Sequence, residues 1–71
     1  MITIDAIGLK CPLPVLKLRK KLTALARGDE VVLLTDDPAA LVDVPHFCAE
    51  TGTQLVSQED EGGILRFVLR K

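Results

Sequence analysis

The chain has 71 residues, of which 48% are hydrophobic and 27% are charged. This length allows a single domain over residues 1–71, and the apolar content excludes a disordered chain. Nine basic residues stand against ten acidic ones, giving a net charge of −1, so no overall basic field attracts nucleic acid.

The two cysteines, Cys11 and Cys48, are too few for a disulfide-rich secreted protein. They lie far apart in the chain, so no zinc-type pair spacing is present. No apolar run approaches the roughly 20 residues that span a bilayer, and residues 1–5 lack the pattern of a signal peptide. We therefore expect a cytoplasmic protein without a membrane segment, a metal or a cofactor.

The first half of the chain predicts a strand followed by a helix. Ile2 and Ile4 alternate with polar residues, which indicates a short strand. Gly8 lies in the loop that follows and is suited to a positive φ. Apolar residues at helical spacing then predict an amphipathic helix over about residues 12–26, which Gly28 ends.

The middle of the chain predicts a second strand and a second helix. Residues 30–35 contain a short apolar run, typical of a strand that is buried on both faces or lies in the middle of a sheet. An Asp-Pro pair beginning at Asp37 predicts a helix start, with the aspartate as N-cap, and Gly52 predicts its end. Pro45 is expected to kink this helix or to split it, with Asp43 capping the second piece.

Two strands close the chain. Residues 53–59 predict a weak strand, and the alternation over residues 65–70 predicts a strong one. Residues 61–63 form a tight reversal between them, so the two strands are expected to form a hairpin. The order is therefore β-α-β-α-β-β, which predicts a two-layer α/β sandwich with two helices over one small sheet.

Charge is segregated along the chain. Residues 10–27 hold six basic residues and no acid, whereas residues 28–61 hold nine acids and neither Lys nor Arg. The two groups either form solvated faces that attract each other or present a basic helix to an acidic protein or to RNA. Phe47 and Phe67 are the two aromatic residues, and both fall on apolar faces, so direct nucleic-acid binding is not expected.

Cys11 is the main candidate for chemistry. It lies at the N-cap of the first predicted helix or one residue from it, where Pro12 and Pro14 fix the backbone. The N–H groups and positive dipole of a helix N-terminus stabilise an anion, Lys10 adds positive charge, and no acid lies within five residues. We expect the pKa of the Cys11 thiol to lie below its ordinary value of about 8.5, as suits a nucleophile or a sulfur carrier. The alternative is a small residue that fills a helix start.

Three other residues carry weaker signals. Cys48 follows Phe47 on the apolar stripe of the second helix, so we expect it to be buried and inert; the alternative is that it resolves an oxidised Cys11. His46 is expected to point to solvent, without a catalytic role. Leu13 is expected to be exposed beside Cys11, either as part of a docking patch or as an isolated surface leucine.

Residues 5–14 resemble the signature of the small TusA/SirA-like sulfur-carrier proteins. That signature is an acid, a Gly-Leu pair, and Cys-Pro-x-Pro at the start of the first helix. Its matching residues here are Asp5, Gly8, Leu9, Cys11, Pro12 and Pro14, with Lys10 as a supporting residue. The segments 36–38, 43–48 and 70–71 also match, so the resemblance covers the whole chain.

The resemblance implies a mixed sheet with strand order 1-2-4-3 and a persulfide carried on Cys11. A cysteine desulfurase or a rhodanese-like protein would donate the sulfur, and a downstream relay protein would accept it. The destinations in the family are tRNA 2-thiouridine, molybdenum cofactor and other sulfur metabolism, and the carrier acts as a co-substrate rather than a stand-alone enzyme. The candidate docking residues are Leu13, Lys17, Lys20 and Lys21.

One residue departs from the family pattern, because Leu13 stands where the tRNA-thiolation members have glutamate between the two prolines. The alternatives to a carrier are a thiol redox regulator that uses Cys11, an RNA- or protein-binding module that uses the basic first helix, and an adaptor that uses Leu13 alone.

Overall fold

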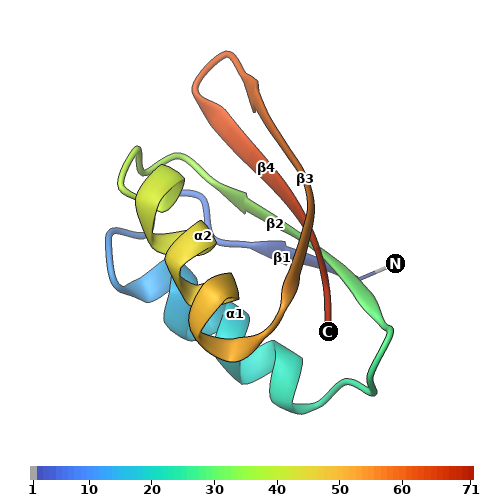
Figure 1. The fold of residues 1–71 in the computed structure, drawn as a ribbon. Helices are drawn as coiled ribbons and strands as arrows, with labels where there is room; N and C mark the ends of the chain where they lie inside the picture. The colour runs from blue at the N-terminus through green and yellow to red at the C-terminus, as the bar shows by residue number, and fades with distance from the viewer. Residues whose placement is uncertain (1) are drawn as a thin grey trace.

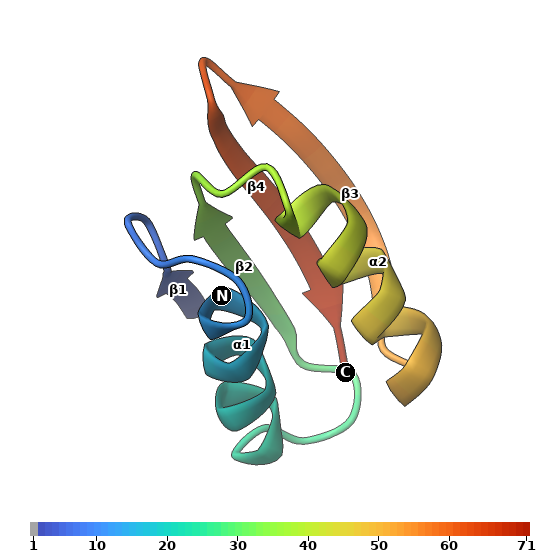
Figure 2. The same cartoon turned by 90° about the vertical axis from the view of Figure 1, so that its left-hand side faces the viewer.

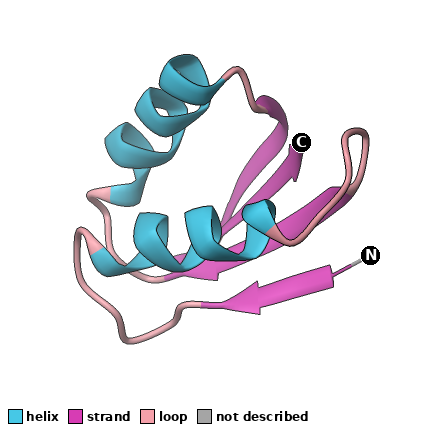
Figure 3. Ribbon diagram, turned by 90° about the horizontal axis from the view of Figure 1, so that it is seen from below, coloured by secondary structure: helices cyan, strands magenta, loops and turns pink. Residues whose placement is uncertain are grey.

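The computed structural model describes residues 2–71 and has two layers, a sheet and a pair of helices on one of its faces (Figures 1 and 3). The elements in chain order are β1 (Ile2–Asp5), α1 (Leu13–Thr23), β2 (Glu30–Thr35), α2 (Ala40–Thr51), β3 (Gln54–Glu61) and β4 (Ile64–Arg70). The strand order is β1-β2-β4-β3 (Figure 2). The predicted element order, the two-layer architecture and the strand order implied by the resemblance are all confirmed.

Strand β2 lies inside the sheet, as its apolar run predicts. It pairs in parallel with β1 and antiparallel with β4. Val31, Val32 and Leu33 are buried, because the helices cover one face of β2 and neighbouring strands flank both its edges. The parallel β1–β2 pair requires a crossover, which α1 supplies.

The core fills the space between the helices and the sheet. Leu18 of α1, Val44 of α2 and Phe67 of β4 are completely buried there. These residues are the apolar positions that the helical and strand periodicities single out. The packing fixes both helices on the sheet, and with them the loops at their N-terminal ends.

Helix α1 ends earlier than its periodicity predicts, at Thr23 rather than near residue 26. The N–H groups of Ala24 and Leu25 donate to carbonyls three residues earlier, at 3.1 Å each, so the last turn tightens and the helix stops. The Ala26 N–H donates to the Asp29 carboxylate at 3.0 Å. The chain therefore leaves the helix before it reaches Gly28, and the expectation that Gly28 stops α1 is wrong.

Helix α2 starts later than predicted, and Asp37 is not its N-cap. The Ala40 N–H donates to the Asp37 carbonyl at 3.0 Å, which forms a single turn before the helix, and the N-cap residue is Ala39. Pro45 lies inside a helix that continues to Thr51. The predicted split with Asp43 as a second cap is therefore wrong, because residues on both sides of the proline pack into the same core.

The β3–β4 hairpin is confirmed, and it projects beyond the helices (Figure 1). Gly62 and Gly63 form its turn with φ values of 64° and 93°, which suit a two-residue hairpin loop. The Gly63 N–H also donates to the Asp60 carboxylate at 2.9 Å. Strand β3 therefore runs through Glu61, further than predicted. None of the helices described between residues 2 and 71 is long and apolar enough to cross a membrane.

Candidate functional site

Cys11 lies in the loop between β1 and α1, with its side chain exposed. The N-cap of α1 is Pro12, so Cys11 precedes it by one residue, which confirms the predicted position. The Leu13 N–H donates to the Lys10 carbonyl at 2.8 Å, closing a four-residue turn around a cis Cys11–Pro12 peptide bond. Pro14 is buried in the first turn of α1, so the turn that presents the sulfur is anchored on the core.

Two consecutive aspartates after β2 hold the Cys11 loop. The Asp36 carboxylate accepts a hydrogen bond from the Gly8 N–H at 3.0 Å, and the Asp37 carboxylate accepts one from the Cys11 N–H at 2.7 Å. The φ of Gly8 is 87°, the positive value that the sequence predicts. Both bonds join segments far apart in the sequence, so the β1–α1 and β2–α2 loops meet at one end of the molecule.

The remaining motif residues shape this loop rather than face the sulfur. The Asp5 carboxylate accepts a hydrogen bond from the Ile7 N–H at 3.0 Å, within the turn that leaves β1. Leu9 is partly buried against the core. The charge of Lys10 acts on Asp37 and helps to lower the pKa of that carboxyl, after the hydrogen bonds from the Cys11 and Ala39 N–H groups.

The Cys11 thiol meets carboxylates rather than a cationic environment. Its pKa is raised above the ordinary value, first by a hydrogen bond to the Asp43 side chain, then by partial desolvation and by the negative charges of Asp43 and Asp37. The predicted lowering of the Cys11 pKa is therefore wrong. Local sequence contains no acid near Cys11, but the fold brings two acids to it from the second helix and the loop before it.

The N-terminus of α1 also offers less to an anion than expected. Pro12 and Pro14 have no N–H, while the N–H groups of Leu13 and Leu16 donate to the carbonyls of Lys10 and Pro12. Few donors of the first turn are therefore free for the sulfur. The prolines that fix the backbone remove part of the helix-terminus effect on which the expectation depended.

The sulfur borders an open hollow of about 170 Å³ between α1 and α2, called the Cys11 hollow below. Its lining residues are Cys11, Pro12, Val15, Arg19, Asp43, His46, Phe47 and Glu50. His46 Nε2 lies 3.2 Å from the Glu50 carboxylate, and the His46 side chain is 71% exposed. The expected exposure of His46 is confirmed, yet its ring also borders the space next to Cys11.

Arg19 is the cation of this hollow, and sequence reasoning did not select it. Its guanidinium lies 5.1 Å from the centre of the Phe47 ring, a cation–π distance. Arg19 occurs in the basic stretch of α1, but nothing in that stretch marks it apart from its neighbours. Its position four residues after Val15 places it on the side of α1 that faces α2.

Cys48 is buried, as predicted, with 7% of its surface exposed. Burial raises the pKa of its thiol, and Cys48 does not border the Cys11 hollow. Its surroundings are those of an inert core residue. They give no support to Cys48 as an accessible partner that resolves an oxidised Cys11.

The candidate docking residues lie on two surfaces. Leu13 is 48% exposed and follows the Cys11–Pro12 pair. Lys17, Lys20 and Lys21 instead line a separate hollow beside β1, which Cys11 does not border, and the Lys17 ammonium donates to the Asp5 carbonyl at 2.6 Å. The fold therefore places Leu13 near the sulfur and turns the three lysines toward the edge of the sheet.

No group of three or more His, Cys, Asp and Glu side chains within residues 2–71 is arranged to hold a metal ion. The chemistry that the described site supports is that of one exposed thiol. That thiol has carboxylates beside it and an open hollow between two helices in front of it.

Comparisons with known proteins cover nearly the whole chain. The model of the sulfurtransferase TusA family matches residues 2–71. The crystal structure of a SirA-like protein from Desulfitobacterium hafniense superimposes with a TM-score of 0.86 and 31% sequence identity, covering 99% of this chain and 96% of that one. The chain therefore belongs to the TusA sulfurtransferase family, whose general role is sulfur carriage and transfer.

Proposed function

We propose that the protein accepts sulfane sulfur as a persulfide on Cys11 and passes it to an acceptor protein. The observation that carries this proposal is the exposed Cys11 thiol, which a buried proline and the Asp37 carboxylate hold at the mouth of an open hollow. A carrier must present one sulfur to two successive partners, so exposure and a fixed backbone matter more here than a deep pocket.

The transfer conserves atoms and electrons. The Cys11 thiolate attacks the outer sulfur of a donor cysteine persulfide, a new S–S bond forms at Cys11, and the donor cysteine leaves as a thiolate. An acceptor thiolate then attacks the outer sulfur on Cys11 and releases the Cys11 thiolate. No external oxidant or reductant is required, which fits a co-substrate that passes between enzymes.

The carboxylates beside Cys11 affect whether its thiol is ionised, and therefore whether it reacts. Asp43 and Asp37 disfavour the Cys11 thiolate in the free protein. A donor surface that brings positive charge to these two aspartates would favour ionisation at the moment of docking. The proposed carrier is therefore less reactive alone than when bound to its donor.

The proposed donor is a cysteine desulfurase or a rhodanese-like protein, and the proposed acceptor is a relay protein in the cytoplasm. Thiolation of tRNA uridine, molybdenum-cofactor synthesis and other sulfur metabolism are the candidate destinations. Leu13, exposed close to the sulfur, replaces the acidic residue of the tRNA-thiolation members and favours an acceptor with an apolar contact surface.

Intact mass spectrometry tests the proposal. The reduced protein is incubated with a cysteine desulfurase and cysteine, then weighed before and after dithiothreitol. We expect a gain of one sulfur atom that dithiothreitol removes, retained in Cys48→Ala and absent in Cys11→Ser. A protein that gains no sulfur, or gains it equally in Cys11→Ser, would refute the proposal.

A further inference from the structure

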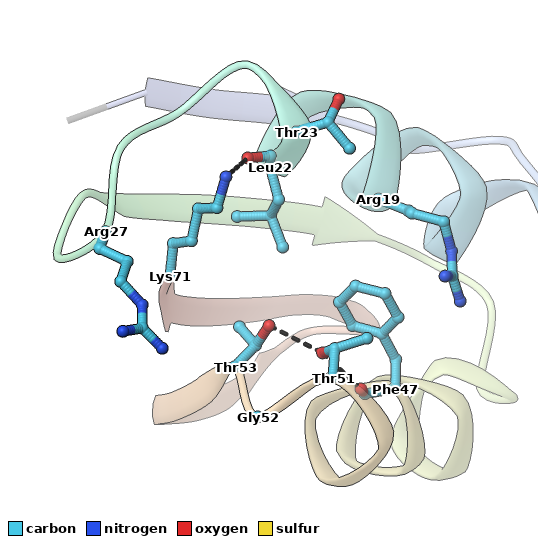
Figure 4. Close-up of a pocket in the computed structure, with 9 residues that line it drawn as sticks. All are labelled: Arg19, Leu22, Thr23, Arg27, Phe47, Thr51, Gly52, Thr53 and Lys71. Carbon is cyan, nitrogen blue, oxygen red and sulfur yellow. Dashed lines mark hydrogen bonds between the residues drawn. The ribbon is translucent and has the colours of Figure 1, made fainter.

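A second hollow, of about 290 Å³, lies between the C-terminal halves of α1 and α2. Six polar or charged residues on its wall are Arg19, Thr23, Arg27, Thr51, Thr53 and Lys71. Figure 4 shows Arg27 and Lys71 at one end and Arg19 at the other, beyond Phe47. No Asp or Glu lines this space, called the distal hollow below.

The cations of the distal hollow have unequal freedom. The Lys71 ammonium donates to the carbonyls of Leu22 and Leu25 at 2.6 Å each, so its donors are occupied by carbonyls at and just beyond the end of α1. Arg19 rests on the Phe47 ring, and Arg27 forms no ion pair within residues 2–71. Two guanidinium groups therefore keep donors free for a ligand.

The helix ends do not cancel this positive charge. Both α1 and α2 end beside the hollow, and each helix C-terminus carries about half a unit of negative charge. Lys71 already bonds the Leu22 carbonyl at the end of α1 and the Leu25 carbonyl beyond it, and the two guanidinium charges exceed the remaining partial negative charge. An anion that enters the hollow is therefore attracted overall.

The hydroxyl groups are turned to the protein. Thr51 Oγ1 donates to the Phe47 carbonyl at 2.8 Å and lies 2.8 Å from Thr53 Oγ1 (Figure 4). Thr23 Oγ1 donates to the Lys20 carbonyl at 2.7 Å. The guanidinium groups, rather than the hydroxyls, must therefore supply the donors to an anion, and their fork suits a planar carboxylate.

We propose that the distal hollow binds an acidic side chain from the same partner protein that places its sulfur at Cys11, an inference that rests on the proposed function. The two hollows share Arg19 and Phe47, so they adjoin on either side of this pair. A partner segment laid across this pair reaches both hollows, and the guanidinium groups of Arg19 and Arg27 are the contacts offered to its carboxylate.

The surroundings favour a protein over a nucleic acid. Asp43 and Glu50 line the adjoining Cys11 hollow, and they repel a phosphate backbone that extends into it. Phe47 is only 3% exposed, so its face is not free to stack on a base. A short acidic segment meets positive charge at the distal hollow alone and avoids the acids nearer the sulfur.

Amide-resolved NMR titration of the full chain tests the inference. The probe is a blocked Glu-Leu-Glu-Glu peptide, and its Gln-for-Glu counterpart is the uncharged control. We expect saturable shifts at Thr51, Gly52 and Thr53 with the acidic peptide and none with the neutral one. Arg27→Gln should weaken binding about tenfold, the loss of roughly one charge-assisted contact. The matched control Arg66→Gln, at a residue that pairs with Glu59 on the sheet, should leave binding unchanged.

Besides a failure of the acidic peptide to bind, three results would overturn the inference. They are equal shifts with the neutral peptide, equal binding by Arg27→Gln, or tighter saturation of the same amides by a six-nucleotide RNA or by inorganic phosphate. The titration uses no persulfide, so it remains readable if Cys11 fails to gain sulfur. If the acidic peptide does not bind while Cys11 gains sulfur normally, the proposal that the distal hollow binds an acidic side chain is refuted and the carrier proposal stands.

Discussion

Thr35 ends the central strand β2 and is completely buried. Its hydroxyl accepts a hydrogen bond from the Asp37 N–H at 3.3 Å, and the Asp37 carboxylate in turn holds the Cys11 N–H. A buried threonine thus fixes the turn that positions the sulfur loop. Thr35→Val keeps the shape of the side chain and removes the hydroxyl, and with it this acceptor.

We expect Thr35→Val to lower the free energy of unfolding by about 1 kcal/mol, although valine is more apolar than threonine. One net hydrogen bond contributes roughly 0.5–1.5 kcal/mol, and the bond here is long. In a domain of this size, 1 kcal/mol corresponds to a fall in melting temperature of about 4–8 °C. If the same 1 kcal/mol is lost from the local stability of the Cys11 loop, the equilibrium constant for opening of that loop rises about fivefold.

Thermal melts and hydrogen exchange of the Cys11 amide measure the two effects. Thr35→Ser is the matched control, because it keeps the hydroxyl and loses one buried methyl, at a cost of about 0.8 kcal/mol. Both variants should melt earlier, but only Thr35→Val should speed exchange at Cys11. A Thr35→Val protein that melts no earlier and protects the Cys11 amide as well as the wild type would refute this chain of contacts.

Three further predictions concern the site. Asp43→Asn should lower the pKa of Cys11, because it removes the carboxylate charge beside the thiol; alkylation rates measured against pH should shift to lower pH, whereas Glu61→Gln on the hairpin should leave the profile unchanged. The pKa of Asp37 is lowered by the hydrogen bonds it accepts, so its contribution to stability is present above about pH 4 and is lost as the pH falls through the lowered value. Urea unfolding of Asp37→Asn should therefore show a shallower acid limb, and an unchanged limb would contradict this reasoning. Because Cys48 is buried, a disulfide reagent such as DTNB should titrate one thiol in the native protein and two after unfolding. Two fast thiols in the native state would contradict its burial.

The fold was largely predictable because its signals are local. The alternation in β1 and β4, the apolar run of β2 and the diglycine turn each depend on a few adjacent residues. The helix ends were less predictable. Asp37 looks like an N-cap in sequence, but its carboxylate bonds the Cys11 N–H as well as the Ala39 N–H, and α2 starts only after a further turn.

The position of Cys11 was predictable and its electrostatics were not. The prolines after Cys11 mark the helix start, so the exposure of the sulfur follows from neighbouring residues. The carboxylates that raise its pKa come from Asp37 and Asp43, on segments that only the folded chain brings to Cys11. Asp37 was visible in the sequence, but its position before a proline assigned it to helix capping.

The hollows between the helices lay outside what the sequence predicts. Arg19 and Arg27 belong to a basic stretch that also contains Lys17, Lys20 and Lys21, the lysines predicted to dock a partner. Helical spacing places Arg19 and the lysines on different sides of α1, since Arg19 faces α2 whereas Lys17 faces β1. Arg27 lies beyond the end of α1, and only the packing of β4 and the α2–β3 turn against that end gives it a pocket.

The most direct test of the central claim follows one sulfur atom through Cys11. The protein is loaded from a desulfurase with heavy-sulfur cysteine, purified away from the donor, and mixed with an unlabelled acceptor thiol. The account predicts a labelled persulfide on Cys11 that leaves with the acceptor as the protein returns to its reduced mass. Label that never reaches Cys11, or that stays there in the presence of every acceptor thiol, would contradict it.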